Sequence, residues 1–240
     1  QGLVAGINAA LSVLDRDLLI IDRSEAYIGV LIDDLVTKEN HEPYRMMTSR
    51  SEYRLLLRQD NADIRLSGIG HKVGLISDER YQAVLDKIDA INKELERLKS
   101  TNIGANKKVQ AFLEANNSTP LKSGTTLAEL IRRPELNYDL VGEIDEKREE
   151  LPEDVREQVN INLKYEGYIK RQTQQVHQFK KAEGRKLDPN FDYSQIQGLR
   201  REAIQKLNLY KPLSIGQASR ISGVSPADIS VLTVYLKQNK

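Results

Sequence analysis

Arginines recur at regular spacing in the first third of the sequence, and their guanidinium groups could bind phosphate. Arg50, Arg54 and Arg58 are four residues apart, so a helix here would place them in one stripe, with Arg45 just before it. A guanidinium can hold two phosphate oxygens at once, which suits a nucleic-acid backbone. The alternative is that nearby carboxylates absorb these arginines within the chain: Glu52, Asp60 and Asp63, or Asp33 and Asp34.

Other side chains that could do chemistry do not form a recognisable site. Asp33 and Asp34 could serve acid–base catalysis or hold a metal, but neighbours on a strand face opposite ways, and a structural role is favoured. The chain has no cysteine and three scattered histidines, His41, His71 and His177, so neither a thiol nucleophile nor a metal site is predicted.

A second basic region follows an acidic one. Nine acidic and two basic residues lie between 135 and 154, whereas eight basic and three acidic residues lie between 156 and 186. A long helix is predicted from residues 152–154 to about 182, with Tyr165 and Tyr168 on its apolar side, where they are more often core than base-stacking groups. The cations that lie off this side could meet solvent or an RNA backbone: Lys164, Lys170, Arg171, Lys180 and Lys181.

The remaining pattern predicts the elements that position these residues. Residues 27–37 are predicted as a β-rich stretch and 44–47 as a second extended piece. Ser49 and Glu52 have the spacing of a capping box, which predicts a helix that carries the arginine stripe. Helices are also predicted over 1–14, from Ser77 to about 98, and over 107–115 and 126–133, with the helix after Ser77 packing inside its own bundle.

The segment SIGQASRISGVSPADISVL, residues 214–232, has the layout of a helix-turn-helix. Gly223 suits the turn, Ser225 the cap and Pro226 the first helical position. The face of the second helix that would read bases, Pro226, Ala227, Asp228 and Ser230, has no Arg, Lys, Asn or Gln to grip base edges. The pattern therefore favours a nearly neutral surface that docks a protein partner, with these candidate docking residues: Ile215, Gln217, Arg220, Asp228 and Leu236.

Several of these runs together resemble one family. EAYIGVLIDDLVTK, EPYRMMTSRSEYRLLLRQDNADIRL, LKYEGYIKRQ and KPLSIGQASRISGVSPADISVL are similar to the C-terminal part of the MnmG/GidA family, flavin-dependent enzymes that modify the tRNA wobble uridine. QGLVAGINAAL resembles the last helix of that family's flavin domain. Met47 stands where an aromatic residue is expected and Ser51 where alanine is expected, but all the arginines are kept.

The resemblance implies both a role and its limits. It implies that the helical C-terminal region helps to hold tRNA and engages the GTPase partner of the modification complex. FAD, with NADH as reductant, and a homodimer are implied for the full-length protein. No GxGxxG fingerprint and no cysteine occurs in this sequence, so this part is predicted to hold no cofactor or metal and to be inactive alone. The alternative function is an independent helix-turn-helix regulator that binds nucleic acid.

The predicted fold is mainly α, a C-terminal multi-helix bundle with a small β-containing N-terminal remnant of a flavin-binding domain. The predicted division is 1–68 for that remnant, 69–155 for a helical subdomain and 156–240 for the tRNA- and partner-docking subdomain. At 240 residues, 39% hydrophobic and 30% charged, the composition is that of a globular protein. No apolar run is long enough to span a membrane and no leader is recognised, so a cytoplasmic location is expected.

Overall fold

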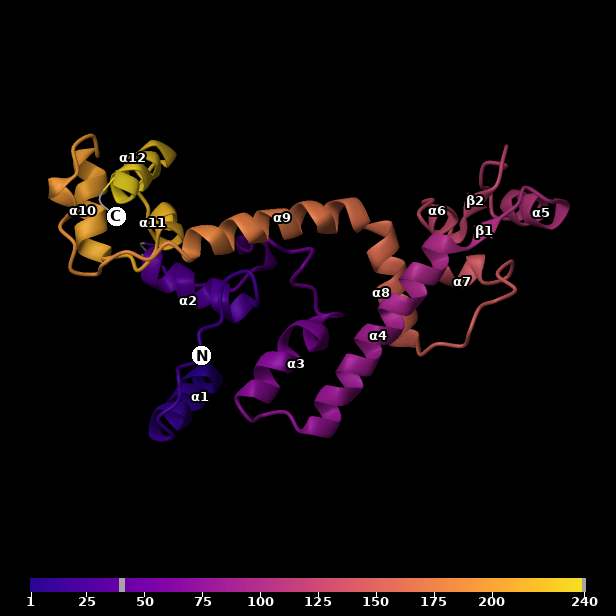
Figure 1. Cartoon of the computed structure of the whole chain (residues 1–240), viewed down its shortest axis with the longest axis horizontal. Coiled ribbons are helices and arrows are strands. Elements are labelled where there is room, and N and C mark those ends of the chain that lie inside the picture. The colour runs from indigo at the N-terminus through magenta and orange to yellow at the C-terminus, as the bar shows by residue number, and fades with distance from the viewer. Residues whose placement is uncertain (39–41, 239–240) are drawn as a thin grey trace. The chain divides into compact units, whose positions relative to one another are not determined.

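The computed structural model describes residues 1–38 and 42–238, and these residues are mainly α-helical (Figure 1). Contacts divide the chain into two compact units. Unit 1 comprises residues 1–57 and 171–240, and unit 2 comprises residues 58–170. The predicted mainly α fold class is confirmed, whereas the three consecutive domains predicted from the sequence stay a prediction.

Unit 2 is a helical bundle with a very short antiparallel sheet. β1 and β2 pair Asn102 with Thr126 and Ile103 with Thr125. The elements of unit 2, before α9 begins, are α3 (Ala62–Lys72), α4 (Asp78–Ser100), β1 (Asn102–Ile103), α5 (Lys107–Ala115), β2 (Thr125–Thr126), α6 (Leu127–Ile131), α7 (Tyr138–Val141) and α8 (Glu153–Lys164).

α4 begins and packs as its sequence predicts. The Ser77 side chain accepts a hydrogen bond from the Arg80 amide, which satisfies one of the unpaired donors at the helix start. Ile91 and Leu98 are buried in the unit 2 core together with side chains of α5, α6 and α8. The predicted helices over 107–115 and 126–133 are confirmed as α5 and α6.

Unit 1 brings the two ends of the chain together. Its elements are α1 (Gly2–Val13), α2 (Tyr27–Thr37), the 3-10 turn η1 (Thr48–Arg50), most of α9 (Glu166–Glu183), the 3-10 turn η2 (Tyr193–Gln195), α10 (Arg201–Tyr210), α11 (Ile215–Arg220) and α12 (Pro226–Gln238). One small core joins Val30 of α2 to Tyr53 and Leu57 of the segment after η1, and Phe179 of α9 packs against it. A second core lies within the C-terminal bundle, around Leu207 and Leu232.

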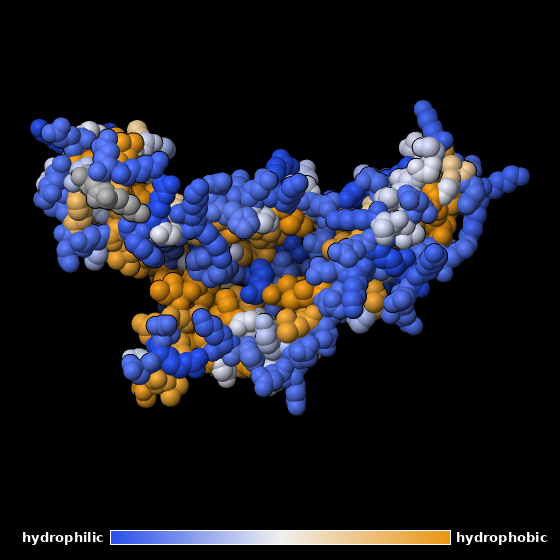
Figure 2. Space-filling view, in the orientation of Figure 1, coloured by the Kyte–Doolittle hydropathy of each residue, from blue (hydrophilic) through white to orange (hydrophobic). Residues whose placement is uncertain are grey.

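α1 presents apolar side chains to solvent. Leu3, Val13 and Leu14 are exposed, and α1 is visible as a hydrophobic region in Figure 2. Gly2 and Gly6 also have no neighbouring atom within 4 Å of where a side chain would begin. The predicted helix over 1–14 is therefore confirmed, with a small and apolar surface.

The prediction of a β-rich stretch over residues 27–37 is wrong, because this segment is helix α2. Its buried residues Val30, Asp34 and Thr37 recur at spacings of four and three, which is helical. β-branched residues favour strands only weakly, and tertiary packing overrides that preference here. No strand lies within the described residues of the first 68, and the short sheet belongs to unit 2.

The prediction of a helix beginning at Ser49 is also wrong. Only the short turn η1 forms, and Ser51 then has an extended backbone, with φ −88° and ψ 133°. The Ser51 side chain accepts a hydrogen bond from the Tyr53 amide at 3.1 Å. Tyr53 and Leu57 are instead buried against α2 and α9, so the segment is held by tertiary contacts. Residues 44–47 precede this turn and form no strand.

The long helix predicted from residues 152–154 to about 182 forms as two helices, α8 and α9. The break is at Tyr165, whose φ of −109° and ψ of 13° end α8. The predicted helix-turn-helix layout is confirmed as α11 and α12, with Gly223 at φ +93° in the turn. A left-handed φ of this kind favours glycine.

Candidate nucleic-acid interface

The segment after η1 is tied to α9 by one side chain. Gln172 of α9 accepts a hydrogen bond from the Leu55 amide at 3.2 Å and donates one to the Glu52 carbonyl at 3.3 Å. Val176 and Phe179, further along α9, pack against Tyr53 and Leu57. Arg54 is therefore held next to α9, and its side chain is exposed.

Asp33 and Asp34 of α2 form an internal ion network. The buried Arg23 contacts both carboxylates and also Glu52, at 2.8 Å. Arg220 of α11 donates two hydrogen bonds of 2.7 Å to Asp33. Burial would raise the pKa of Asp34, but bonds from Lys38, Tyr44 and Arg23 lower it. These contacts agree with the structural role favoured for the acidic pair.

Arg50 packs on a tyrosine at the edge of this network. Its guanidinium lies 4.4 Å from the centre of the Tyr44 ring, and one nitrogen is 3.9 Å from Asp34. The Tyr44 hydroxyl donates a 2.8 Å hydrogen bond to Asp34, and burial together with this contact raises the pKa of Tyr44 to about 12. The Arg50 guanidinium is thus partly engaged in contacts within the chain.

The predicted stripe of Arg50, Arg54 and Arg58 does not exist, because no helix spans these residues. Arg58 belongs to unit 2, where it bonds Asp60 at 3.0 Å and Gln158 at 3.3 Å. Pairing with Asp60, one of the alternatives considered, is therefore observed for Arg58. Arg45 and Arg54 are the exposed members of this arginine set.

Lys164 is engaged inside unit 2. Its amine donates hydrogen bonds to the carbonyls of Arg133 and Leu136, at the turn before α7. Burial lowers its pKa. This lysine therefore closes a turn, and its side chain is only partly exposed.

The other predicted cations lie on α9, whose two acidic residues are paired. Glu166 pairs with Lys99 at 2.7 Å and with Arg132, and Glu183 pairs with Arg220. Lys180 contacts Glu25 at 3.2 Å. The helix therefore keeps a positive surface with these exposed side chains: Lys170, Arg171, Lys180 and Lys181.

The predicted docking residues of the C-terminal bundle are mostly covered. Ile215 and Asp228 are buried, at 3% and 2% exposure, so the expectation that they face a partner is wrong. Arg220 is engaged with Asp33, and Leu236 packs against the bundle core. The Gln217 side chain accepts a 2.7 Å hydrogen bond from the Leu213 amide.

Asp228 caps its own helix. Its carboxylate accepts hydrogen bonds from Arg200 at 2.7 Å and from the Ser225 amide at 2.8 Å, and the Ser225 hydroxyl accepts one from the Asp228 amide. These contacts, chiefly the one with Arg200, hold the pKa of Asp228 well below its usual range. The predicted Ser225 cap is confirmed.

Apolar side chains missed by the sequence reasoning are exposed on the same bundle. Leu209, Leu213 and Val234 have exposed fractions of 69%, 55% and 53%. A pocket of about 550 Å³ borders Val234 and is otherwise lined by Gln195, Ile196, Gln197, Ser230, Val231, Tyr235 and Gln238. The sequence shows that these residues are apolar, but it does not show which apolar residues of the bundle are left exposed.

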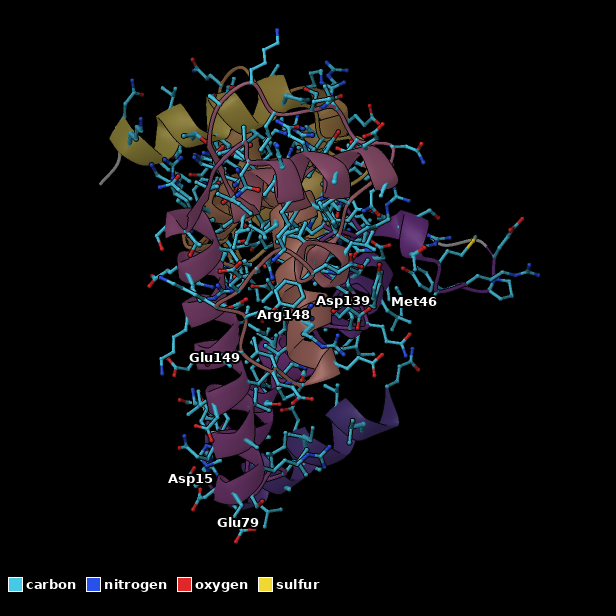
Figure 3. All side chains as sticks on the ribbon, turned by 90° about the vertical axis from the view of Figure 1, so that its right-hand side faces the viewer. Asp15, Met46, Glu79, Asp139, Arg148 and Glu149 are labelled. Atoms are coloured by element: carbon cyan, nitrogen blue, oxygen red, sulfur yellow. The ribbon has the colours of Figure 1, made fainter. Side chains whose placement is uncertain are left out.

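The acidic block between residues 135 and 154 is partly neutralised within unit 2. Asp139 pairs with Arg148 at 2.6 Å and also contacts Arg156, and Figure 3 shows Asp139 and Arg148 close together. Arg97 pairs with Asp145 at 2.6 Å. No group of His, Asp or Glu in the described part of the chain is arranged to hold a metal ion. No helix there is long and apolar enough to cross a membrane.

A pocket of about 870 Å³ lies between α3, α4 and the start of α8. Its charged centre is Lys87, which pairs with Asp63 at 2.9 Å and Asp154 at 2.8 Å. Burial would lower the pKa of Lys87, but these two carboxylates raise it. Lys87 thus links α4 to α3 and α8 through one carboxylate on each.

Comparisons with known proteins agree across the chain. Residues 78–173 match the family described as the tRNA modifying enzyme MnmG/GidA C-terminal helical domain, and residues 175–240 match its C-terminal helical bundle. The tRNA uridine 5-carboxymethylaminomethyl modification enzyme MnmG of Lachnoclostridium phytofermentans is 63% identical over 238 residues, which is 99% of this chain and 38% of that protein. The enzyme of the same description from Caldicellulosiruptor saccharolyticus is 59% identical over 240 residues, which is 100% of this chain and 38% of that protein.

Solved structures give the same result. The structure of Aquifex aeolicus GidA in its form II crystal matches with a TM-score of 0.80 and 43% identity, covering 98% of this chain and 37% of that one. The form I crystal matches with the same TM-score and 42% identity, over 98% of this chain and 36% of that one. The chain thus spans well under half the length of the proteins it resembles.

Proposed function

Because the chain belongs to the MnmG/GidA family, of which it has the C-terminal helical region, we propose that it supplies the tRNA-binding and partner-docking part of a tRNA uridine 5-carboxymethylaminomethyl modification enzyme. The observation that carries this proposal is the positive surface of α9. Both acidic residues of that helix are paired, while Lys170 and Lys181 are exposed.

The geometry supports contact with phosphates. Cations spread along one helix can follow a nucleic-acid backbone, whose negative charges are closely spaced. Arg54 is held next to α9 by the Gln172 contacts, and it adds a guanidinium to this surface. Arg45 is exposed in the preceding segment. Lys164 and Arg58 are left out of the proposed interface, because each is bonded inside unit 2.

We place the docking of the GTPase partner on the C-terminal bundle, at its exposed apolar side chains. Val234, at the pocket of about 550 Å³, and Leu213 replace the covered residues Ile215 and Asp228 in this proposal. Partly exposed apolar side chains beside a pocket, with a polar rim, are typical of a protein-docking surface. Val234→Asp should weaken capture of the GTPase, whereas Leu75→Asp, at a similarly exposed apolar position in unit 2, should not.

The alternative of an independent DNA-binding regulator is not favoured. α12 presents Pro226, Ala227 and Ser230 to solvent, and none of these can grip a base edge as Arg or Asn does. Asp228 is committed to Arg200 and Ser225. The fold of a helix-turn-helix is kept without the charge that DNA binding requires.

The flavin chemistry is proposed to lie in the part of the relatives that this chain does not cover. α1 offers small residues to open space, which suits close approach of a cofactor or another backbone, but one helix does not enclose a flavin. FAD, NADH, a homodimer and a cytoplasmic location are accordingly proposed for the longer protein alone, and no reaction step is assigned to residues of this chain.

The test is tRNA affinity measured against salt concentration. Lys170→Glu combined with Arg171→Glu should weaken binding and flatten the plot of log affinity against log salt, by roughly 0.7–0.9 for each phosphate that the helix no longer neutralises. Lys107→Glu combined with Lys122→Glu, two exposed cations elsewhere, gives the same change in charge and should leave the slope near that of the parent. An unchanged slope in the first pair, or tighter binding to duplex DNA than to tRNA, would contradict the proposal.

A further inference from the structure

Two tyrosines at the junction of α8 and α9 are exposed, although their spacing predicts a core position. Tyr165 is 47% exposed and Tyr168 is 58% exposed. All other tyrosines and phenylalanines of the chain lie in its described part and are buried or half-buried. An aromatic side chain exposed to this extent forgoes about half of the free energy that full burial would provide. A surface that exposes two neighbouring rings therefore points to a ligand.

The backbone places these two residues on one turn at the start of α9. Tyr165 and Tyr168 are three residues apart, a spacing that brings side chains together on a helix. The Tyr165 carbonyl accepts hydrogen bonds from the amides of Tyr168 and Ile169, both at 2.9 Å, so the first turn of α9 sets their spacing. Gly167, between the two tyrosines in sequence, has no atom within 4 Å of where a side chain would begin, so this turn of α9 is open to solvent at that position.

The charges around the rings suit an anionic ligand. Glu166, between the tyrosines in sequence, pairs with Lys99 at 2.7 Å and with Arg132. Arg132 also contacts Glu129. With Lys170 exposed two residues beyond Tyr168, three cations face two carboxylates, and the local balance is positive.

We propose that Tyr165 and Tyr168 form a stacking site for an unpaired base of the bound tRNA, with Lys170, two residues further along α9, available to a phosphate. This rests on the tRNA-binding function proposed above and adds a contact to the base itself. Aromatic rings stack on bases without needing a particular sequence, and nearby cations hold the backbone. Bases inside a duplex are already stacked on their neighbours, so the ligand is a nucleotide in a loop or single-stranded end.

The surroundings favour RNA over a protein as the occupant. The residues that follow on α9, Gln172 to Gln175, are polar, and α9 has no fully buried residue. A protein-docking surface has a contiguous apolar centre that is depleted in charge. Here the start of α9 carries the charged residues Glu166 and Lys170, so the surface lacks a charge-depleted apolar centre.

Fluorescence gives a direct test, because the chain contains no tryptophan. Tyr168→Trp in the whole chain introduces a single indole at the proposed site. A single-stranded oligouridylate of about eight nucleotides should quench it, and an abasic strand of equal length should quench much less. Leu75→Trp, at a position in unit 2 that is also 58% exposed, is the matched control and should respond to neither strand. Equal quenching by the abasic strand, or none, would overturn the stacking site.

Affinity for tRNA separates this inference from the proposed function. Tyr165→Ala combined with Tyr168→Ala should weaken tRNA binding about tenfold at every salt concentration without changing the salt slope, because stacking releases no counterions. Phenylalanine at both positions should restore binding. If the parent binds tRNA with a salt-dependent affinity that the alanine pair leaves unchanged, the stacking site is wrong and the proposed function stands. If oligouridylate quenches the indole of the Tyr168→Trp variant while the parent does not bind tRNA, the two tyrosines stack on bases and the proposed tRNA-binding function is wrong.

Discussion

Lys164 and Lys170 lie six residues apart in one basic run, yet the structure gives them different roles. Lys164 bonds two carbonyls of a turn, whereas Lys170 is exposed. Lys164→Met should lower the free energy of unfolding by about 1–3 kcal/mol, because the carbonyls of Arg133 and Leu136 lose their charged donor and only that of Arg133 keeps another, the Leu136 amide. Lys170→Met should leave stability unchanged and reduce the salt slope of tRNA binding. Chemical denaturation and a salt titration of both variants would measure this.

The opposite pattern would reassign both lysines. If Lys164→Met flattened the salt slope at parental stability, its amine would have to leave the turn and contact RNA. The tertiary position of the two amines, which the sequence does not contain, is what distinguishes them.

Asp228 offers a stability prediction with a defined pH dependence. Asp228→Asn should cost about 1–3 kcal/mol of unfolding free energy at neutral pH, because a buried carboxylate loses its charged bond to Arg200. Since the contacts with Arg200 and Ser225 lower the pKa of Asp228 in the folded state, its contribution is complete above the unfolded-state pKa of about 4. The contribution is lost as the pH falls through the lower, folded-state pKa.

The stability gap between the parent and Asp228→Asn should therefore narrow as the pH falls below about 4, in urea denaturation followed by circular dichroism. Glu202→Gln is the control, because Glu202 is exposed and lies 3.9 Å from the same Arg200. It should change stability little at any pH. A gap that stayed constant down to about pH 2 would show that the carboxylate charge is not what stabilises this turn.

At the scale of elements, prediction succeeded where local signals agreed with packing. Ser77 caps α4, Gly223 takes a left-handed turn and Ser225 caps α12, and each signal lies within a few residues of the feature it sets. The predicted strand over residues 27–37 is wrong because β-branched residues there suggest a strand, whereas the spacing of the buried positions is helical. The predicted helix after Ser49 does not form, and the Leu55 amide and the Glu52 carbonyl instead bond Gln172, more than a hundred residues away.

The bond between α2 and α11 has a measurable strength. Arg220 holds Asp33 through two 2.7 Å hydrogen bonds, and the two side chains are 15% and 16% exposed. A double-mutant cycle with Asp33→Asn and Arg220→Met should give a coupling free energy of about 1–3 kcal/mol. The cycle is needed because Asp33 also contacts Arg23 and Arg220 also contacts Glu183.

The pair of Lys93 and Asp89 on α4 provides the comparison. Both side chains are highly exposed, at 76% and 61%, so solvent should screen their interaction and the same cycle should give a coupling close to zero. Equal coupling in the two cycles would mean that partial burial adds nothing to the bond between α2 and α11.

At the scale of the whole molecule, the chain has separate hydrophobic cores in its two units. Leu113→Ala removes a fully buried side chain from the unit 2 core, and Leu207→Ala does the same in the C-terminal bundle of unit 1. Each should cost about 2–5 kcal/mol in the unit that contains it. Hydrogen exchange should show reduced protection mainly within that unit. Equal reduction in both units for either variant would show that they unfold as one.

The basic residues of the candidate nucleic-acid interface could be located from the sequence, but which of them are exposed could not. The sequence located the basic runs and the family, and the exposed Lys170 and Lys181 were among the predicted residues. Three other predicted cations are bonded within the chain: Arg58 to Asp60, Arg220 to Asp33 and Lys164 to a turn carbonyl. The partners of Arg220 and Lys164 lie far away in the sequence, so the sequence alone does not identify these two bonds. Tyr165 and Tyr168 fall at a helix break, where the periodic pattern no longer reports which side is covered.

Gly29 of α2 will affect how mutational screens of this chain are interpreted. A side chain there would begin 2.3 Å from the Asp22 carbonyl oxygen, so even alanine must displace α2 and with it Asp33 and Asp34. In a growth-based screen, substitutions at Gly29 should be as damaging as removal of a ligand-binding side chain, although glycine has no side chain to offer a ligand. Intolerance to substitution at Gly29 would reflect the lack of space beside the backbone. A parallel measurement of protein abundance would distinguish such positions from residues that bind a ligand or partner.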